Sequence, residues 1–163
     1  MCFVLYIASD SPIPDIPWDD TAPKLHTTAL TEHDSAVRGA FTKRNVKYLG
    51  SSNHCGCGFR HPSNQIGEWP EEYLIGNDPE FGSDTQEDHD SLYKFLIQQS
   101  KSTNEIEIYG CWDGEFSEPP ARHEKIQVDD VVSDEFFLRE RCHYTINLKP
   151  NHTDDRGITN GSL

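Results

Sequence analysis

Residues 46–61 read VKYLGSSNHCGCGFRH, and they hold a strand followed by the densest group of reactive side chains in the chain. The apolar run 46–49 contains a β-branched residue and an aromatic one, which is typical of a strand. Turn-forming residues at 50–53 then end it. The thiols of Cys55 and Cys57 follow, separated by one glycine. We therefore expect a strand over 46–51 that leads directly into a candidate functional loop.

The segments on either side predict further strands and two helices. FVLYIA at 3–8 is typical of a buried strand, and EIEIYG at 105–110 alternates with a period of two. Capping patterns at 31–34 and 85–88 each precede apolar residues at helical spacing. The expected strands are 3–8, 26–30, 46–51, 105–110, 125–128 and 143–148, and the expected helices are 32–42 and 86–101.

The order of these elements predicts an α/β or α+β fold with a mixed sheet. A strand–helix–strand unit within one sheet normally joins parallel strands. We therefore expect the strands 3–8, 46–51 and 105–110 to be parallel, with helices packed on the sheet and later strands added antiparallel. A long loop joins the second of these strands to the second helix. Residues 1–149 should form one domain, and 150–163 a frayed polar tail.

The charge of the chain limits its partners. The 163 residues include 14 Lys and Arg against 28 Asp and Glu, a net charge of −14. This charge repels nucleic-acid backbones and anionic membranes, so neither is an expected partner. It suits a basic protein partner or a cationic small-molecule ligand, although a solvated acidic surface is the simpler explanation.

The cysteines and the apolar runs together predict a cytoplasmic protein. The longest apolar run, Cys2–Ala8, is too short for a transmembrane helix and lacks the features of a signal peptide. The number of cysteines, five, is odd. An odd number of cysteines without a secretion signal indicates free thiols in a reducing compartment.

Polar and thiol side chains follow three of the expected strands. If those strands are parallel, their carboxyl ends lie at one end of the sheet, where open α/β sheets bind ligands. The candidate ligand-binding residues at that end are Asp10, Ser51, Ser52, His54, Trp112 and Asp113. The candidate thiols are Cys55, Cys57 and Cys111. Within this group Asp113 could orient His54 or a ligand amine, and the two serines beside Gly50 resemble an anion-binding turn.

Three stretches together resemble a group of small uncharacterised bacterial proteins. They are LYIASD near the start, YLGSSNHCGCGF in the middle and YGCWDGE late in the chain. The resemblance covers most of residues 2–148 and implies a bacterial cytosolic source. It implies no activity, since none is assigned to such proteins.

The CGCGF motif has three interpretations. Cys55, Cys57 and Cys111 could bind a soft metal such as zinc. The further ligand could be Cys2, His54, His61 or His143. Alternatively, a thiolate at Cys57 or Cys111 could act as a nucleophile. In the third interpretation the motif is a glycine-rich turn with two small, unreactive cysteines.

These interpretations give three hypotheses about function. The first is a small-molecule or metal-binding domain with its site at the CGCGF loop. The second is an acidic protein-interaction module without chemistry, of the inhibitor or immunity type. The third is a thiol-dependent enzyme that uses Cys57.

Overall fold

The structure is a computed structural model that describes residues 2–59, 82–133, 136 and 138–149. It has an α+β fold, with one helix, three short 3-10 helices and a mixed six-stranded sheet in these residues. The strands are β1 Phe3–Ser9, β2 His26–Ala29, β3 Asn45–Gly50, β4 Glu105–Trp112, β5 Arg122–Gln127 and β6 Cys142–Asn147. The helix is α1 Gly82–Gln99, and the 3-10 helices are η1 Ser35–Ala40, η2 Gly56–Gly58 and η4 Val128–Val132.

The sheet has the strand order β2-β3-β1-β4-β6-β5. The most apolar strand, β1, therefore lies inside the sheet, between β3 and β4. It is antiparallel to both of these neighbours. β4 is also antiparallel to β6, and among the described strands only β5 and β6 pair in parallel.

The prediction that the first three major strands are parallel is therefore wrong, and the path of the chain between β1 and β3 explains why. After β1, the proline-rich segment 10–25 returns along the sheet, so that His26 of β2 lies beside Gly50. β2 then runs in the direction of β1, and η1 connects it to the antiparallel β3. Residues 33–43, which include η1, run over one face of the sheet from Asp113, 3.8 Å from His33, to Asp10, 3.1 Å from Lys43. β3 therefore begins beside the end of β1, where Asn45 pairs with Ser9.

A strand–helix–strand unit does exist further along the chain. β3 and β4 both run antiparallel to β1, so they share one direction on either side of it. The helix α1 lies between them in sequence. The ends of β3 and β4 consequently lie at one end of the sheet together with the start of β1, which we call the CGCGF end. The end of β1 lies at the other, which we call the Asp10 end.

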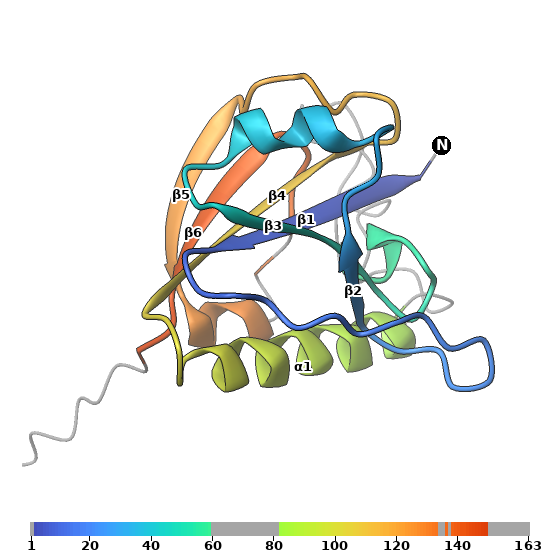
Figure 1. Cartoon of the computed structure of the whole chain (residues 1–163). Helices are drawn as coiled ribbons and strands as arrows, with labels where there is room; N and C mark the ends of the chain where they lie inside the picture. The colour runs from blue at the N-terminus through green and yellow to red at the C-terminus, as the bar shows by residue number, and fades with distance from the viewer. Residues whose placement is uncertain (1, 60–81, 134–135, 137, 150–163) are drawn as a thin grey trace, which may run out of the picture.

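Each face of the sheet has its own hydrophobic core. Phe3, Leu5 and Ile7 of β1 point to the face covered by α1, where they pack with Leu92 and Leu96. The alternate side chains of β1 point to the opposite face, which η1 covers in part. Figure 1 shows the sheet between α1 and η1. The alternation in β1 thus fixes which residues can meet across the sheet.

The expected helix 32–42 is a shorter 3-10 helix, whereas α1 starts earlier than expected, at Gly82. Asp34 accepts hydrogen bonds from the amide nitrogen of Thr31 at 2.6 Å and from its hydroxyl at 2.8 Å.

No helix in the described ranges is long and apolar enough to cross a membrane. Most of the expected long loop, with His61, lies outside the described residues, as does the expected tail 150–163.

Candidate functional site

The structure places the residues predicted to form a site at two ends of the sheet. Those after β3 and β4 lie at the CGCGF end. Asp10 lies at the Asp10 end, where its carboxylate is 3.1 Å from the Lys43 ammonium group. Because β1 is antiparallel to its neighbours, Asp10 does not join the others.

The hydroxyl of Ser51 organises the turn that follows β3. It donates to the carbonyl of Cys55 at 2.7 Å. It also accepts from the amides of Asn53 at 3.2 Å and Gly58 at 3.1 Å. Ser51 is fully buried. Its hydrogen-bonding capacity is therefore used within the turn, which leaves none of it for a ligand.

A buried carboxylate on α1 fastens the same turn. Asp88 accepts from the amide of Ser52 at 2.9 Å and from its hydroxyl at 2.8 Å. A Cβ on Gly58 would lie 2.2 Å from the Asp88 carboxylate and 2.4 Å from the Ser51 hydroxyl. Only glycine fits at this position. A carboxylate at this place also repels anions, which argues against an anion-binding turn at Ser51 and Ser52.

The three thiols proposed as metal ligands do not converge. Cys57 packs against the α1 face and lies 3.9 Å from the carbonyl oxygen of Phe3. Cys111 pairs with Val4 in the sheet, so its side chain points to the opposite face. No group of three or more His, Cys, Asp and Glu side chains in the described ranges could hold a metal ion. The alternation of side chains along β4 is the reason that Cys111 is separated from Cys57.

The environment of two of these thiols disfavours thiolate chemistry. Burial and nearby acidic groups raise the pKa of Cys111 to about 12. A hydrogen bond with Cys57, together with burial, raises the pKa of Cys55 above its ordinary value. A thiol must lose its proton to act as a nucleophile. These two thiols are therefore in their unreactive form at neutral pH.

A hollow of about 270 Å³ opens at the CGCGF end, on the η1 face, and we call it the Asp113 hollow. Five segments of the chain contribute to it. Its lining consists of Cys2, Val4, Tyr6, Thr31, His33, Asp34, Tyr48, His54, Cys55, Asp113 and Phe116. The structure thus brings together three of the predicted residues, namely His54, Cys55 and Asp113.

The Asp113 hollow is acidic and aromatic. Its lining contains two carboxylates, Asp34 and Asp113, and no lysine or arginine. The rings of Tyr6 and Phe116 meet edge to face with their centroids 6.3 Å apart. Burial and the charge of Asp34 raise the pKa of Tyr6 above its usual range, so its hydroxyl stays neutral. A hollow lined by carboxylates and aromatic rings favours a cation over an anion.

The backbone at the rim of this hollow is held by specific contacts. His54 has a left-handed conformation with φ of 67°, and its carbonyl accepts from the Tyr48 hydroxyl at 3.0 Å. Its ring stacks on that of His26, with centroids 5.4 Å apart, and meets the ring of Trp18 at 4.7 Å. The sequence analysis had placed His54 in the loop after the strand 46–51. Nothing in the sequence indicated that Trp18 would lie beside it.

A second polar group, which the sequence did not indicate, lies on the η1 face toward the Asp10 end. Glu107 and His143 are both buried, with a carboxylate oxygen 3.5 Å from Nε2 of the imidazole. Glu107 also accepts from the amides of Thr42 at 2.9 Å and Lys43 at 3.2 Å, and from the Thr42 hydroxyl. Alternation in EIEIYG places Glu107 opposite the isoleucines, and this predicts exposure rather than burial.

The electrostatics of this pair follow from burial and hydrogen bonding. Burial alone would raise the pKa of Glu107, but the hydrogen bonds from Thr42 and Lys43 outweigh it and lower that pKa. Burial lowers the pKa of His143, and the charge of Glu107 offsets this only in part. The pair is therefore a carboxylate beside a neutral imidazole at neutral pH.

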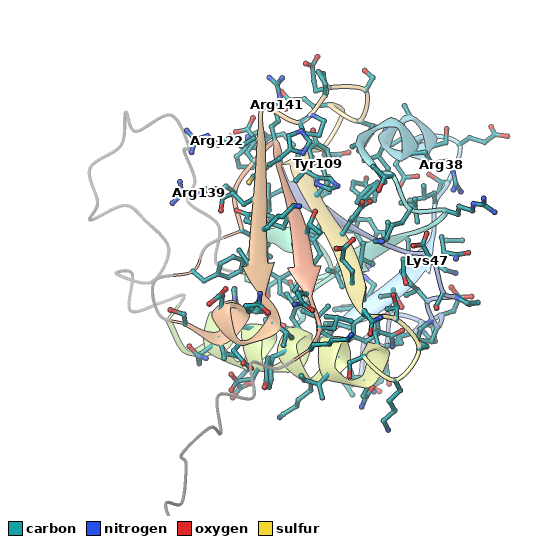
Figure 2. All side chains as sticks on the ribbon, turned by 90° about the vertical axis from the view of Figure 1, so that its left-hand side faces the viewer. Arg38, Lys47, Tyr109, Arg122, Arg139 and Arg141 are labelled. Carbon is teal, nitrogen blue, oxygen red and sulfur yellow. The ribbon has the colours of Figure 1, made fainter. Side chains whose placement is uncertain are left out.

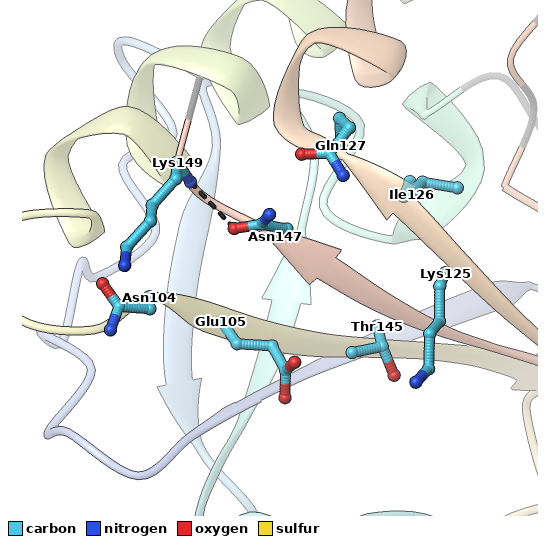
Figure 3. Close-up of a pocket in the computed structure, with 8 residues that line it drawn as sticks. All are labelled: Asn104, Glu105, Lys125, Ile126, Gln127, Thr145, Asn147 and Lys149. Atoms are coloured by element: carbon cyan, nitrogen blue, oxygen red, sulfur yellow. Dashed lines mark hydrogen bonds between the residues drawn. The ribbon is translucent and has the colours of Figure 1, made fainter. Parts of the chain in front are cut away.

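A third region, at the Asp10 ends of β4, β5 and β6, forms an open polar hollow of about 410 Å³ (Figure 3). Much of its polar lining is already paired. Glu105 lies 3.1 Å from the Lys43 ammonium group, and the Asn147 side chain accepts from the Lys149 amide at 3.1 Å. The hollow contains none of the residues that the sequence pointed to.

Comparisons of this chain with models of protein families, with curated proteins and with solved structures found no match.

Proposed function

We propose that the protein is a binding domain that takes a small organic cation, such as an alkylammonium group, in the Asp113 hollow. The observation that carries this proposal is the composition of the lining. Two carboxylates and three aromatic rings face a hollow to which no lysine or arginine contributes. An ammonium ion gains from both kinds of group, by charge attraction and by contact with aromatic faces.

The charges around the hollow support a cation as the ligand. Asp113 is exposed and lies 3.8 Å from Nε2 of His33. Its carboxylate is therefore open to solvent and to a ligand. The amide of Asp113 donates to the carbonyl of Cys2 at 2.9 Å, which fixes the turn that presents this carboxylate.

The size of the hollow suggests a compact ligand. About 270 Å³ is near the lower end of the range for small-molecule sites. An exposed carboxylate binds with modest strength, because water competes for it. We therefore expect dissociation constants in the millimolar range, or somewhat tighter, for the simplest alkylammonium ions.

The partners and the compartment that we propose follow from charge and cysteine content. The net charge of −14 makes nucleic acid an unfavourable partner. All five cysteines lie in described parts of the chain and are free, which suits the reducing cytoplasm.

Titration followed by NMR tests the proposal. We expect tetramethylammonium to shift the backbone amide signals of residues around the hollow, and the neutral probe tert-butanol to shift them much less. Asp113→Asn should weaken binding of tetramethylammonium at least fivefold, since it removes the exposed charge without changing the side-chain shape.

Asp10→Asn is the matched control. It removes one carboxylate at the opposite end of the sheet, so binding should be unchanged if the hollow is responsible. Equal weakening by both variants would mean that only the overall negative charge attracts the cation, and the proposal would fail. Equal binding of the neutral probe would contradict it as well.

A further inference from the structure

Arginine side chains gather at the Asp10 end of the sheet, in a different hollow from the one discussed above. This hollow has a volume of about 340 Å³. It lies where β2 ends and β3 begins, beside η1. Arg38, Arg44 and Lys47 contribute to its lining, and no acidic side chain does. We call it the Arg38–Arg44 hollow.

The two arginines lack partners in the described parts of the chain, where neither guanidinium group forms an ion pair or a hydrogen bond. The third cation, Lys47, is paired with Asp15 at 2.5 Å. Acidic residues are twice as numerous as basic ones in this protein. This excess of carboxylates does not neutralise Arg38 or Arg44, so both guanidinium groups are open to an anion that enters the hollow.

The rest of the lining is apolar or fixed by its own contacts. Ile13 and Val46 are buried, and Leu30 packs against the core of the η1 face. The Asn45 side chain donates to the carbonyls of Ser9 at 3.2 Å and Asp10 at 2.9 Å, so it is held in place. The hollow thus combines an apolar floor with a cationic rim.

We propose that the Arg38–Arg44 hollow binds a small carboxylic acid with an apolar body. The planar guanidinium group matches a carboxylate with two parallel hydrogen bonds, which favours this anion. The apolar body would cover Leu30 and Val46, which both belong to the η1 face. The volume is within the range of small-molecule sites. The two hollows share no lining residue, although Lys47 of this one is next to Tyr48 of the Asp113 hollow in β3.

The net negative charge of the protein opposes the binding of the proposed ligand, which is an anion. A protein with net charge −14 repels anions in general. Binding of a carboxylate therefore requires a local site rather than unspecific attraction. Since both arginines are exposed, solvent weakens the interaction, and we expect dissociation constants between about 0.1 and 10 mM.

NMR titration of the full chain with benzoate tests this site, with benzamide as the neutral probe. We expect benzoate to shift amide signals of residues 13, 29–30 and 44–47, and benzamide to have little effect. The double variant Arg38→Leu/Arg44→Leu should weaken benzoate binding at least tenfold. Arg44→Lys, which keeps the charge but not the planar geometry, should weaken it less than Arg44→Leu.

Arg122→Leu is the matched control, since it removes an exposed arginine from the start of β5. Figure 2 shows Arg122 on the opposite side of the molecule from Arg38 and Lys47. Its effect on benzoate binding should be small. Equal losses in Arg122→Leu and the double variant would overturn the proposal, as would equal binding of benzamide or tighter binding of inorganic phosphate. Absence of benzoate binding at 20 mM, roughly twice the weakest constant expected, would overturn it too.

Discussion

The turns before and after β3 are each fastened by a buried carboxylate, but the two carboxylates have different surroundings. After β3, Asp88 on α1 accepts from the amide and hydroxyl of Ser52. Before β3, Glu107 on β4 accepts from the amide and hydroxyl of Thr42. Asp88 is packed against a glycine with no space for a side chain, whereas Glu107 lies beside His143.

This difference shows that similar hydrogen bonds can serve different purposes. The Asp88 turn depends on shape, because Gly58 must let the carboxylate approach the backbone. The Glu107 turn depends on charge, because a neutral imidazole and three donors surround the carboxylate. Neither carboxylate lines the Asp113 hollow, so both act on the fold rather than on the ligand that we propose.

The largest effect is expected from Gly58→Ala, which tests the dependence on shape. Its Cβ would overlap the Asp88 carboxylate and the Ser51 side chain, where the nearest atoms lie at 2.2 to 2.7 Å. We expect a loss of about 3 kcal/mol in the free energy of unfolding, measured with urea. Gly39→Ala is the control, because nothing lies within 4 Å of its added Cβ. Similar losses in both variants would mean that the close approach at Gly58 is unimportant.

A smaller effect is expected from Glu107→Leu, which tests the dependence on charge. The variant keeps much of the side-chain volume but leaves the amides of Thr42 and Lys43 without their acceptor. We expect a loss of roughly 2 kcal/mol, since these donors are only partly able to reach water. Glu105→Leu, two residues earlier in β4 and exposed, should cost far less. If the two losses are equal, burial of Glu107 does not matter to stability.

The smallest effect concerns the pH dependence of stability. Burial lowers the pKa of His143 in the folded protein. The unfolded chain therefore takes up a proton first as the pH falls, and stability decreases below the ordinary histidine pKa of about 6.5. The lowered pKa of Glu107 adds a further loss at more acidic pH. Urea unfolding of His143→Gln between pH 5 and 8 should show a flatter dependence than that of the parent protein. An unchanged slope would exclude His143 as the cause.

The sequence predicted the strands well but not their directions. Alternation and β-branched residues identified β1, β3, β4 and β6 to within one or two residues, because each strand has a buried face. Direction depends on how often the chain traverses the sheet. Here the chain returns along the sheet before η1, and residues 33–43 then run back over it, so that β3 begins beside the end of β1. The sequence gives no local sign of that return.

The candidate site was predicted in part for the same reason. His54, Cys55 and Asp113 meet because they follow strands that do share a direction. Asp10 and Cys111 do not join them, because one lies at the other end of the sheet and the other points to the other face. Trp18 and Glu107 were missed because long-range packing places them, and no periodic pattern encodes it.

The central position of β1 has a consequence for how the protein folds. β1 precedes the other strands of this sheet in the chain, yet its partner β4 lies about 100 residues later, as in the pair of Phe3 with Trp112. At a synthesis rate of roughly 5 to 20 residues per second, β4 is completed on the order of 5 to 20 s after β1. During this time the apolar β1 lacks its second neighbour. Pairing across so long a stretch gives a high contact order, which slows folding. Refolding should therefore be limited by the closure of the sheet around β1, and much less by the formation of α1.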